Sequence, residues 1–334
     1  MKIIVPMAGR GKRMRPHTLT IPKPLLPIAG KPIVQRLVED IAAVCQEPIE
    51  EIGFIIGDFG KEVEEHLKQV AKDLGAVGKV FHQEEALGTA HAILCAQEIM
   101  QGKTIVAFAD TLFRADFKLD DDEDGIIWVQ KVADPKAFGV VKLDDNNYIT
   151  DFIEKPKEFV SDLAIIGIYY FKDGEYLREN LQYLIDNDIK DKGEYQITEA
   201  LERMKKAGMK FAPGQVTEWL DCGNKNATVH TNQRVLEFIK NDKIVAASAK
   251  LINTQIIEPC YIGENVELTN CIIGPHVSIG DNTKVEDSII SNSIIQTNSA
   301  LSGVFTENSM IGNHSTIKYA PTELSVGDYN ELKH

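Results

Sequence analysis

A loop rich in glycine and cationic side chains lies near the start of the chain and opposes the charge of the rest. The protein has a formal net charge of −14, yet its first acidic residue is Glu39. The loop spans residues 8–16 and follows a short apolar stretch, Ile3–Val5. Glycines let backbone N–H groups approach an anion, and arginines add bidentate hydrogen bonds to phosphate oxygens. The pattern predicts a site for a small anionic ligand, most simply a polyphosphate, with a plain surface turn as the alternative.

A proline-rich segment, Pro22–Pro32, follows this loop. Each proline fixes its own φ and restricts the residue before it, so the segment is stiff and can hold Lys23 beside the loop. Two familiar phosphate loops are excluded. The sequence lacks the Gly-x-x-x-x-Gly-Lys-Ser/Thr pattern of a Walker A motif, and Met14 stands where the dinucleotide fingerprint needs its third glycine.

A second candidate segment, Gln83–Ala90, follows a predicted strand and opens a predicted helix. The Gln83 carboxamide offers a donor and an acceptor, which suits the imide edge of uracil or thymine. Gly88 and Thr89 are small enough for a base or its phosphates to pack closely at the helix start. A helix cap followed by core packing is the alternative reading.

Carboxylates that could hold a metal ion occur at two places. Asp110 follows the predicted strand Ile105–Phe108, so its side chain should emerge at the edge of the sheet. Phosphoryl chemistry needs a hard cation, and Mg²⁺ is usually held by one or two carboxylates together with phosphates. Asp221, in the segment Trp219–Gly223, is a second carboxylate further along the chain. A simple turn residue is the alternative for Asp110.

A third group of residues combines open backbone with a pair of opposite charges. Gly139 leaves its backbone open to a ligand. Glu154 can accept hydrogen bonds from hydroxyl groups, and Lys155 can bind an anion such as a phosphate. Taken alone, a Glu-Lys pair in a loop is more often a solvent-exposed ion pair of little energetic value.

The elements that must position these groups alternate along the first part of the chain. Short apolar runs are predicted to be strands at Ile3–Val5, Ile52–Ile56, Val80–Phe81 and Ile105–Phe108. Helical spacing is present in 33–44 and 61–74, and a third helix is predicted over 88–100. This alternation predicts a mostly parallel sheet with helices on both faces and ligands at the carboxyl ends of the strands. Residues 113–240 continue the mixed pattern, with strands at 139–143 and 165–171 and helices at 196–207 and 227–239.

The sequence pattern changes from about residue 244. Helical periodicity ends, and units such as Ile262–Val266, Ile273–Val277 and Ile279–Thr283 recur. Apolar residues about every six positions indicate a hexapeptide β-helix, with turns at Gly, Asn or Asp. An irregular or looped-out coil is expected between Leu301 and Ser309. We therefore predict two domains, 1–240 and 241–334.

Composition limits the kind of protein. An apolar fraction of 43% and a charged fraction of 26% are ordinary for a soluble globular chain. No apolar stretch is long enough to cross a membrane, and no signal peptide is evident. The 5 cysteines lack metal-type spacing and suggest reduced thiols in the cytoplasm. The acidic balance argues against nucleic acid as a partner.

The segment AGRGKRMRPHTLTIPKPLLPIAGKP, residues 8–32, resembles the signature of the sugar-1-phosphate nucleotidyltransferases. The likeness is greatest to the long glucose-1-phosphate thymidylyltransferases, which carry a C-terminal left-handed β-helix. Further matches lie at 83–90, 134–141, 154–157, 193–198 and 219–223. The resemblance implies an α/β, Rossmann-like catalytic domain with a mostly parallel mixed sheet, followed by a left-handed parallel β-helix.

The resemblance also implies an activity and a set of roles. A nucleotidyl group would pass from a nucleoside triphosphate to a sugar-1-phosphate, with Mg²⁺ on Asp110 and Asp221. The catalytic residues would be Arg13, Lys23, Asp110, Lys155 and Asp221. The nucleotide contacts would be Ala8, Gly9, Arg10, Gly11, Lys12, Arg13, Lys23, Gln83, Gly88 and Thr89. The sugar-phosphate contacts would be Gly139, Glu154, Lys155, Gly167 and Glu194.

Several alternatives stay open at this stage. The substrate pair expected from the resemblance is dTTP with glucose-1-phosphate. The segment 83–90 also fits uridylyltransferases acting on glucose- or N-acetylglucosamine-1-phosphate, and a mannose-1-phosphate guanylyltransferase is a further possibility. An acyltransferase activity of the β-helix that uses His276 or His314, and a catalytically silent assembly protein, are the readings from other classes. The β-helix is expected to mediate contacts within a homo-oligomer.

Overall fold

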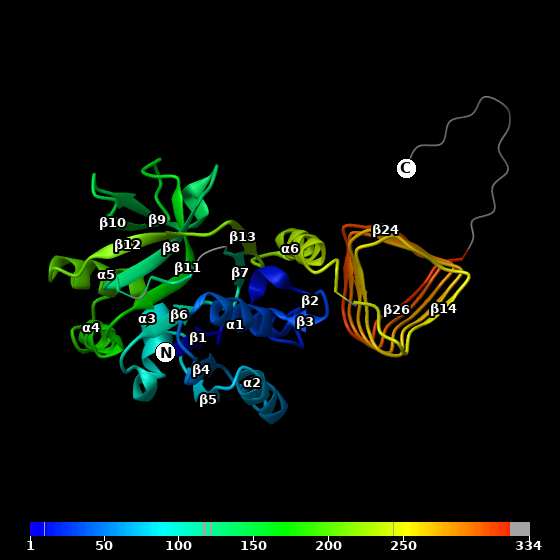
Figure 1. Cartoon of the computed structure of the whole chain (residues 1–334), viewed down its shortest axis with the longest axis horizontal. Helices are drawn as coiled ribbons and strands as arrows, with labels where there is room; N and C mark the ends of the chain where they lie inside the picture. Colours follow the sequence, from blue (N-terminus) through cyan, green and yellow to red (C-terminus); the bar gives the residue numbers. More distant parts are fainter. Residues whose placement is uncertain (10, 116–117, 121, 243, 321–334) are drawn as a thin grey trace. The chain divides into compact units, whose positions relative to one another are not determined.

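A computed structural model of the chain describes residues 1–334 except 10, 116–117, 121, 243 and 321–334 (Figure 1). The described chain forms two compact units. The first contains Met1–Pro27 and Lys31–Thr228, and the second contains Ile28–Gly30 and the described residues from Val229 onward. The chain therefore passes from one unit to the other within a helix, and the domain boundary after residue 240 stays a prediction.

A mixed sheet of nine strands forms the centre of the first unit (Figure 1). Its main path has the order β10-β9-β11-β6-β1-β4-β5, with β8 paired to β11 and β12 paired to β8. Strands β6, β1, β4 and β5 are parallel, whereas β11 is antiparallel to β6, β8 and β9. The sheet is mixed as predicted, and its parallel half is the half formed by the first strands of the chain.

The strands of this sheet are β1 (Lys2–Pro6), β4 (Glu51–Ile56), β5 (Val77–His82), β6 (Thr104–Ala107), β8 (Gly125–Lys131), β9 (Gly139–Leu143), β10 (Ile149–Glu154), β11 (Leu163–Phe171) and β12 (Phe211–Gln215). Two small ribbons accompany it: β2 (Pro27–Ile28) with β3 (Lys31–Pro32), and β7 (Thr111–Arg114) with β13 (Glu218–Asp221). All four strands predicted before residue 110 are present. Strands β1, β4 and β6 are buried because each is an apolar run in the middle of the sheet, whereas β5 at the edge is only partly buried.

The helices are α1 (Ile33–Val44), α2 (Lys61–Asp73), α3 (Thr89–Leu94), α4 (Gly174–Asp186), α5 (Ile197–Lys206) and α6 (Lys225–Phe238). Helix α1 has the predicted bounds, and its buried residues recur at helical spacing. The third helix is shorter than predicted. It ends at Leu94 because Ala96 leaves the helical region (φ −95°, ψ 23°), and a 3-10 turn over Gln97–Ile99 follows.

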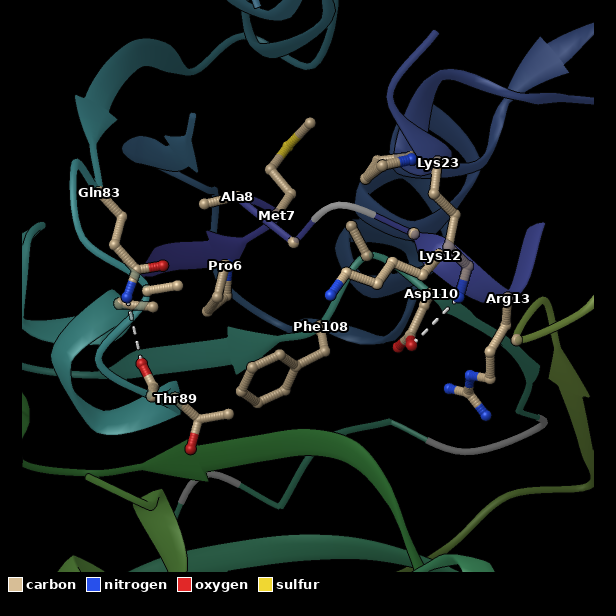
Figure 2. A pocket seen from close by; sticks show the side chains of 18 of the residues that line it. Pro6, Met7, Ala8, Lys12, Arg13, Lys23, Gln83, Thr89, Phe108 and Asp110 are labelled. Carbon is tan, nitrogen blue, oxygen red and sulfur yellow. Dashed lines mark hydrogen bonds and ion pairs between the residues drawn. The ribbon is translucent and has the colours of Figure 1, made fainter. Parts of the chain in front are cut away.

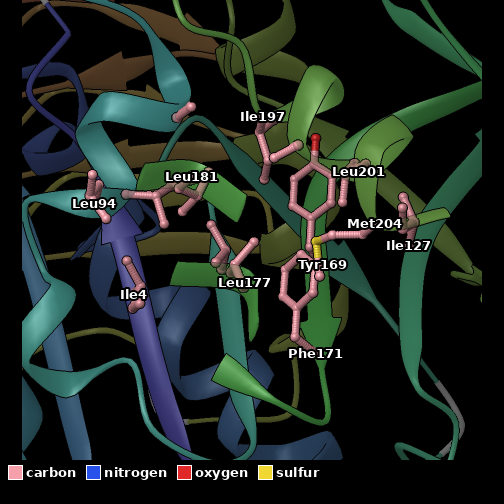
Figure 3. Close-up of a cluster of buried hydrophobic side chains, with 14 of the residues drawn as sticks. Ile4, Leu94, Ile127, Tyr169, Phe171, Leu177, Leu181, Ile197, Leu201 and Met204 are labelled. Carbon is pink, nitrogen blue, oxygen red and sulfur yellow. The ribbon is translucent and has the colours of Figure 1, made fainter. Parts of the chain in front are cut away.

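One apolar cluster joins helices α3, α4 and α5 to the sheet (Figure 3). Leu177 and Leu181 of α4 and Leu201 of α5 are fully buried there, together with Ile4 of β1. Helix α4 was not predicted, although leucines at 177, 181 and 184 share one face and Asp173 caps its first turn through the Tyr176 N–H (2.9 Å). The cluster supports the sheet beneath the ends of β1 and β6.

The second unit contains stacked coils with three parallel faces, as expected of a left-handed β-helix. The first face holds β14 (Lys250–Ile252), β17 (Glu267–Thr269), β20 (Lys284–Glu286), β23 (Ala300–Ser302) and β26 (Thr316–Lys318). The second holds β15 (Gln255–Ile256), β18 (Ile272–Ile273), β21 (Ile289–Ser291) and β24 (Phe305–Glu307). The third holds β16 (Cys260–Ile262), β19 (Val277–Ile279), β22 (Ile294–Ile295) and β25 (Met310–Ile311).

The corners of the coils use the predicted turn residues. Asn265, Asn282 and Asn298 all adopt left-handed backbone angles, and the Asn265 amide donates to Asn282 in the next coil (3.2 Å). The expected irregular coil at 301–309 is wrong. Leu301 and Val304 point into the core, and β23 and β24 continue the ladders. The later coils instead shorten, since stacked corner residues lie 17 positions apart early in the β-helix and 16 apart later.

Two general properties of the chain follow from the described residues. None of their helices combines the length and the apolar character needed to span a membrane. All five cysteines are free thiols, and burial raises the pKa of Cys260 to about 11.

Candidate active site

A cavity of about 430 Å³ opens at the carboxyl ends of β1 and β6 (Figure 2). Its lining residues are Pro6, Met7, Ala8, Gly9, Gly11, Lys12, Arg13, Lys23, Pro24, Gln83, Ala86, Gly88, Thr89, Ala92, Phe108, Ala109, Asp110, Glu194 and Gly223. The loop after β1, the segment 83–90 and the residues after β6 therefore meet in one place, at the sheet edge where the sequence predicted the ligand. Arg10, another predicted contact, lies outside the described residues.

Glycine occupies the two described glycine positions of the loop for different structural reasons. Gly11 is left-handed (φ 54°), and a Cβ there would lie 3.0 Å from the Lys23 Cβ. The Gly11 carbonyl also accepts a hydrogen bond from the Thr18 hydroxyl (2.8 Å). A Cβ on Gly9 would meet no atom of the other described residues within 4 Å, so the position has open space beside it. Gly11 thus allows the Lys23 stem to approach the loop, whereas Gly9 leaves space beside it.

The stiff segment places Lys23 where the sequence predicted it. Lys23 is only 7% exposed, and its Nζ lies 3.1 Å from Asp110 Oδ2 (Figure 2). A buried ammonium group is stable only when it is paired, so Asp110 both neutralises and orients this side chain. Arg13 and Lys12 line the cavity beside this pair.

Asp221 is brought next to Asp110 by the small antiparallel ribbon. Asp221 pairs with Thr111 across β13 and β7, and the Cys222 N–H donates to the Asp110 carbonyl (3.0 Å). Burial raises the pKa of Asp221, and the charge of Asp110 raises it further. The Gly223 N–H, which donates to Asp221 Oδ1 (2.8 Å), and the nearby cations Lys23 and Arg13 oppose this rise.

The two carboxylates thus repel each other in a partly buried setting, which is the donor chemistry that a divalent cation neutralises. Among the described residues no group of three or more His, Cys, Asp or Glu side chains could hold a metal ion. The pair Asp110 and Asp221 is the arrangement that fits the predicted metal.

The segment 83–90 forms the other wall of the cavity. A Cβ on Gly88 would lie 2.4 Å from the Tyr195 carbonyl, so glycine is required here by a protein contact. The Ala90 N–H donates to that carbonyl (2.9 Å), and Thr89 Oγ1 accepts from the Ile197 N–H (2.9 Å). The predicted reason for Gly88, close packing of a base, is therefore joined by a second one: the segment is fixed to residues 195–197.

The predicted sugar-phosphate contacts divide into two groups. Glu194 lines the cavity, whereas Gly139, Glu154, Lys155 and Gly167 lie outside its wall, on or beside β9, β10 and β11. Gly139 and Glu154 are direct partners across β9 and β10.

Lys155 is left-handed (φ 47°), and its Nζ lies 3.2 Å from Glu154 Oε1. Its N–H donates to the Phe138 carbonyl (3.1 Å). The Gly167 carbonyl accepts from the Phe108 N–H (2.9 Å), which connects β11 to the cavity floor.

Two aromatic residues at the site were not predicted. Phe108 lines the cavity (Figure 2). Its ring meets that of Tyr169 edge-on, with centroids 6.2 Å apart. Burial raises the pKa of Tyr169, and the charges of Glu154 and Asp110 raise it further. Tyr169 therefore lies within electrostatic reach of both the Lys23–Asp110 pair and the Glu154–Lys155 pair. No motif marks Tyr169 as a site residue, since Tyr169 and its neighbour Tyr170 differ only in the face of the strand that they occupy.

Known proteins resemble this chain in sequence and in fold. The chain matches the Nucleotidyl transferase family over residues 2–237. A glucose-1-phosphate thymidylyltransferase of Streptomyces antibioticus is 30% identical over 364 aligned positions, which cover 100% of this chain and 99% of that protein. The bifunctional protein GlmU of Methanococcus maripaludis is 30% identical over 76% of this chain, and the aligned part is 58% of that longer protein.

A solved structure, a UDP-glucose pyrophosphorylase complexed with UDP-glucose, has the same fold with a TM-score of 0.59. It is 24% identical, and the comparison covers 71% of this chain and 98% of that one. The family match contains every residue that lines the cavity, as the signature at 8–32 predicted. The chain belongs to the nucleotidyl transferase family.

Proposed function

We propose that this protein transfers a nucleotidyl group from a nucleoside triphosphate to a sugar-1-phosphate, giving an NDP-sugar and pyrophosphate. One observation carries the proposal: a single cavity has Lys23, Arg13 and Asp110 on one side and Gln83 on the other (Figure 2). A nucleoside triphosphate needs both a cationic surface for its phosphates and an amide for its base edge.

The reaction needs no protein nucleophile. A phosphate oxygen of the sugar-1-phosphate attacks the α-phosphorus in line, and the bond from that phosphorus to the leaving pyrophosphate breaks. Arg13 binds the β- and γ-phosphates and stabilises the leaving group. Lys23 is directed at the α-phosphate, and Lys155 anchors the incoming sugar phosphate. Catalysis then rests on positioning and on neutralising charge.

The remaining predicted contacts complete the two substrate sites. Ala8, Gly9, Arg10, Gly11, Lys12, Gln83, Gly88 and Thr89 are proposed to bind the nucleotide. Gly139, Glu154, Gly167 and Glu194 are proposed to bind the sugar. Tyr169 lies close to both groups of residues, since burial raises its pKa and the charges of Glu154 and Asp110 raise it further.

Nucleotidyltransferases of this family generally use a divalent metal ion. We propose Mg²⁺, held by Asp110 and Asp221 together with substrate phosphates. When bound, the ion supplies positive charge to the phosphates that react. Lys23 is paired with Asp110, so the carboxylate that orients the Lys23 ammonium group would also help to hold the metal ion.

The favoured substrates are dTTP and glucose-1-phosphate. The support is the Streptomyces thymidylyltransferase, which aligns with this chain over its whole length. UTP with glucose- or N-acetylglucosamine-1-phosphate is the second candidate, because an imide edge is common to thymine and uracil. GTP with mannose-1-phosphate is the third. The single methyl that separates thymine from uracil changes binding by only roughly 1–3 kcal/mol.

We also propose that the protein is a homo-oligomer joined through the second face of the β-helix. The third face packs on α6, where Ser278 donates to Asn232 (2.8 Å). The first face carries the charged ladder Lys250–Glu267–Lys284. The second face exposes an apolar ladder, Ile272, Ile289 and Phe305, in register on successive strands. A second copy is the occupant that such a repeated apolar face fits.

Light scattering on the intact chain tests the oligomer. Phe305→Lys should shift the mass toward the monomer, whereas Lys284→Ser on the charged face should not. An unchanged mass for both variants would contradict the interface.

An acyltransferase role for the β-helix gains no support from its histidines. His276 Nε2 lies 2.6 Å from Glu237 Oε1, and both His276 and His314 occupy left-handed corners.

We propose that the reaction takes place in the cytoplasm. None of the five cysteines, all of which lie in the described part of the chain, forms a disulfide bond, which is in keeping with a reducing compartment.

Pyrophosphate release tests the reaction. Five triphosphates (dTTP, UTP, GTP, CTP and ATP) are crossed with glucose-, N-acetylglucosamine-, galactose- and mannose-1-phosphate in the presence of Mg²⁺. We expect a strong signal for one pair, with dTTP and glucose-1-phosphate first. Silence across the panel from a folded sample would favour the non-catalytic reading.

A further inference from the structure

The side-chain amide of Gln83 has both of its hydrogens committed inside the protein. Its Nε2 lies 3.2 Å from the Gly88 carbonyl oxygen and 3.1 Å from His91 Nδ1. A carboxamide nitrogen carries two N–H donors, so these two contacts use both of them. The other end of the amide, Oε1, points into the cavity (Figure 2).

The Gly88 carbonyl sets the direction of this amide, because a carbonyl can only accept. If the amide were reversed, Oε1 would face the Gly88 oxygen with no hydrogen between two acceptors. The Gly88 oxygen cannot move away easily. Gly88 is packed against the Tyr195 backbone, and its carbonyl also accepts from the Ala92 N–H (3.1 Å) in the first turn of α3.

His91 completes the arrangement from one turn along the same helix. Its Nδ1 accepts the second Gln83 hydrogen when the ring is neutral with its proton on Nε2. The Gly88 carbonyl keeps the nitrogen end of the amide turned inward, but one hydrogen bond does not fix the plane of the amide. Without the His91 acceptor, the plane could rotate about the bond to Gly88 and carry Oε1 away from its place in the cavity. His91 is half-buried and is absent from the cavity lining, so its effect on a ligand passes through Gln83.

We propose that His91 is a positioning residue for base selection, which holds Gln83 so that it offers the cavity an acceptor and no donor. The inference rests on the proposed function, in which Gln83 reads the base. An acceptor at this place selects a base with a ring N–H on its pairing edge, as in thymine, uracil or guanine. Cytosine and adenine present a lone pair there, which would oppose Gln83 Oε1.

Calorimetric binding of dTTP, UTP and CTP to the full chain tests this inference without relying on turnover. The His91→Leu variant removes the acceptor, whereas His91→Asn keeps an acceptor oxygen close to the place of Nδ1. His66→Leu is the matched control, since it makes the same chemical change at an exposed position of α2.

The wild-type protein and the His66→Leu variant should bind dTTP and UTP at least about tenfold more tightly than CTP, as expected when one hydrogen bond is replaced by two opposed acceptors. His91→Leu should lose most of this preference, and His91→Asn should recover it. The inference is overturned if His91→Leu keeps the wild-type preference, or if His91→Asn and His91→Leu lose it equally.

Pyrophosphate release measured on the same samples separates this inference from the proposed function. Base-selective binding that depends on His91, without turnover of any pair, would contradict the proposed reaction and leave the role of His91 standing. Turnover with a preference that ignores His91 would do the reverse. The absence of nucleotide binding would overturn both.

Discussion

The two lysines proposed to take part in the reaction differ in how deeply they are buried and in how firmly their side chains are held. Lys23 and Lys155 each lie close to a carboxylate, at 3.1 Å from Asp110 and 3.2 Å from Glu154. The side chain of Lys23 is 9% exposed, whereas that of Lys155 is 61% exposed. The Lys23 stem packs against Gly11, but Lys155 pairs with the residue next to it in sequence.

This difference suggests that the two proposed substrate sites are preorganised to different degrees. On the nucleotide side, the cation, its carboxylate and the base-reading amide are held in place before any ligand arrives. On the sugar-phosphate side, the exposed pair Glu154–Lys155 is free to reorganise, because such pairs are weak in water. We infer that the proposed nucleotide site is preorganised, whereas the proposed sugar-phosphate site would be completed by its ligand.

The largest losses of turnover are expected from substitutions on the proposed nucleotide side of the site. Asp110→Asn and Arg13→Ala should each lower turnover by roughly 10²–10³-fold, since each removes a charge directed at the reacting phosphates. Steady-state pyrophosphate release measures this loss. Asp242→Asn, an exposed change in the second unit, is the charge-matched control. Near-normal rates in either variant, with an unchanged circular dichroism spectrum, would rule out the assignment.

The two loop glycines offer a sharper comparison. Gly11→Ala should destabilise the protein by about 1–2 kcal/mol, because the residue is left-handed and its Cβ would press on Lys23. Gly9→Ala should leave the unfolding free energy within about 0.5 kcal/mol and mainly raise the KM for the triphosphate. Denaturant unfolding together with triphosphate KM values distinguishes them. Equal destabilisation by both changes would show that Gly9 is not the open position described here.

The pH dependence of metal binding tests Asp221. Its pKa is raised in the folded protein, so the folded apoprotein holds the proton more tightly than the unfolded chain does. The contribution of Asp221 to stability therefore falls as the pH rises from about 3.8 through the folded pKa.

Mg²⁺ needs the ionised carboxylate, so the rise in Tm that Mg²⁺ causes should be larger at pH 7.5 than near pH 4, where a carboxyl group with a raised pKa is largely protonated. In Asp221→Asn this pH-dependent part should disappear. An equal Mg²⁺ effect at both pH values in the wild-type protein would contradict the metal role of Asp221.

The smallest effect concerns the stability of the exposed pair. Lys155→Ala should change the free energy of unfolding by less than about 1 kcal/mol. Lys23→Ala should cost about 1–3 kcal/mol, because it leaves Asp110 without its buried partner. Chemical denaturation of the two variants measures the difference. If both changes had the same cost, the two sides of the site would not differ in preorganisation.

Much of the site followed from local sequence. The apolar run before the loop, the prolines around Lys23 and the position of Asp110 after a strand each have a local cause, and the structure brings these residues to one cavity. Helix α1 and the β-helix were readable because their apolar spacing is regular. The regular coil at 301–309 was missed because the coils shorten by one residue, which disturbs the spacing without breaking the stack.

Other features depend on contacts between distant segments. Gly88 looked like part of a ligand site, yet its glycine is required by the Tyr195 backbone, more than a hundred positions away. Tyr169 becomes part of the site only because β11 lies beside β6. His91 matters through the orientation of Gln83, which no spacing in the sequence reveals.

The most direct test of the proposed reaction is its stoichiometry with dTTP, glucose-1-phosphate and Mg²⁺. We expect dTDP-glucose and pyrophosphate to form in equal amounts, only when all three are present, and to be nearly abolished in Asp110→Asn. Pyrophosphate release that does not require any sugar-1-phosphate, or equal rates in Asp110→Asn and the wild-type protein, would contradict it.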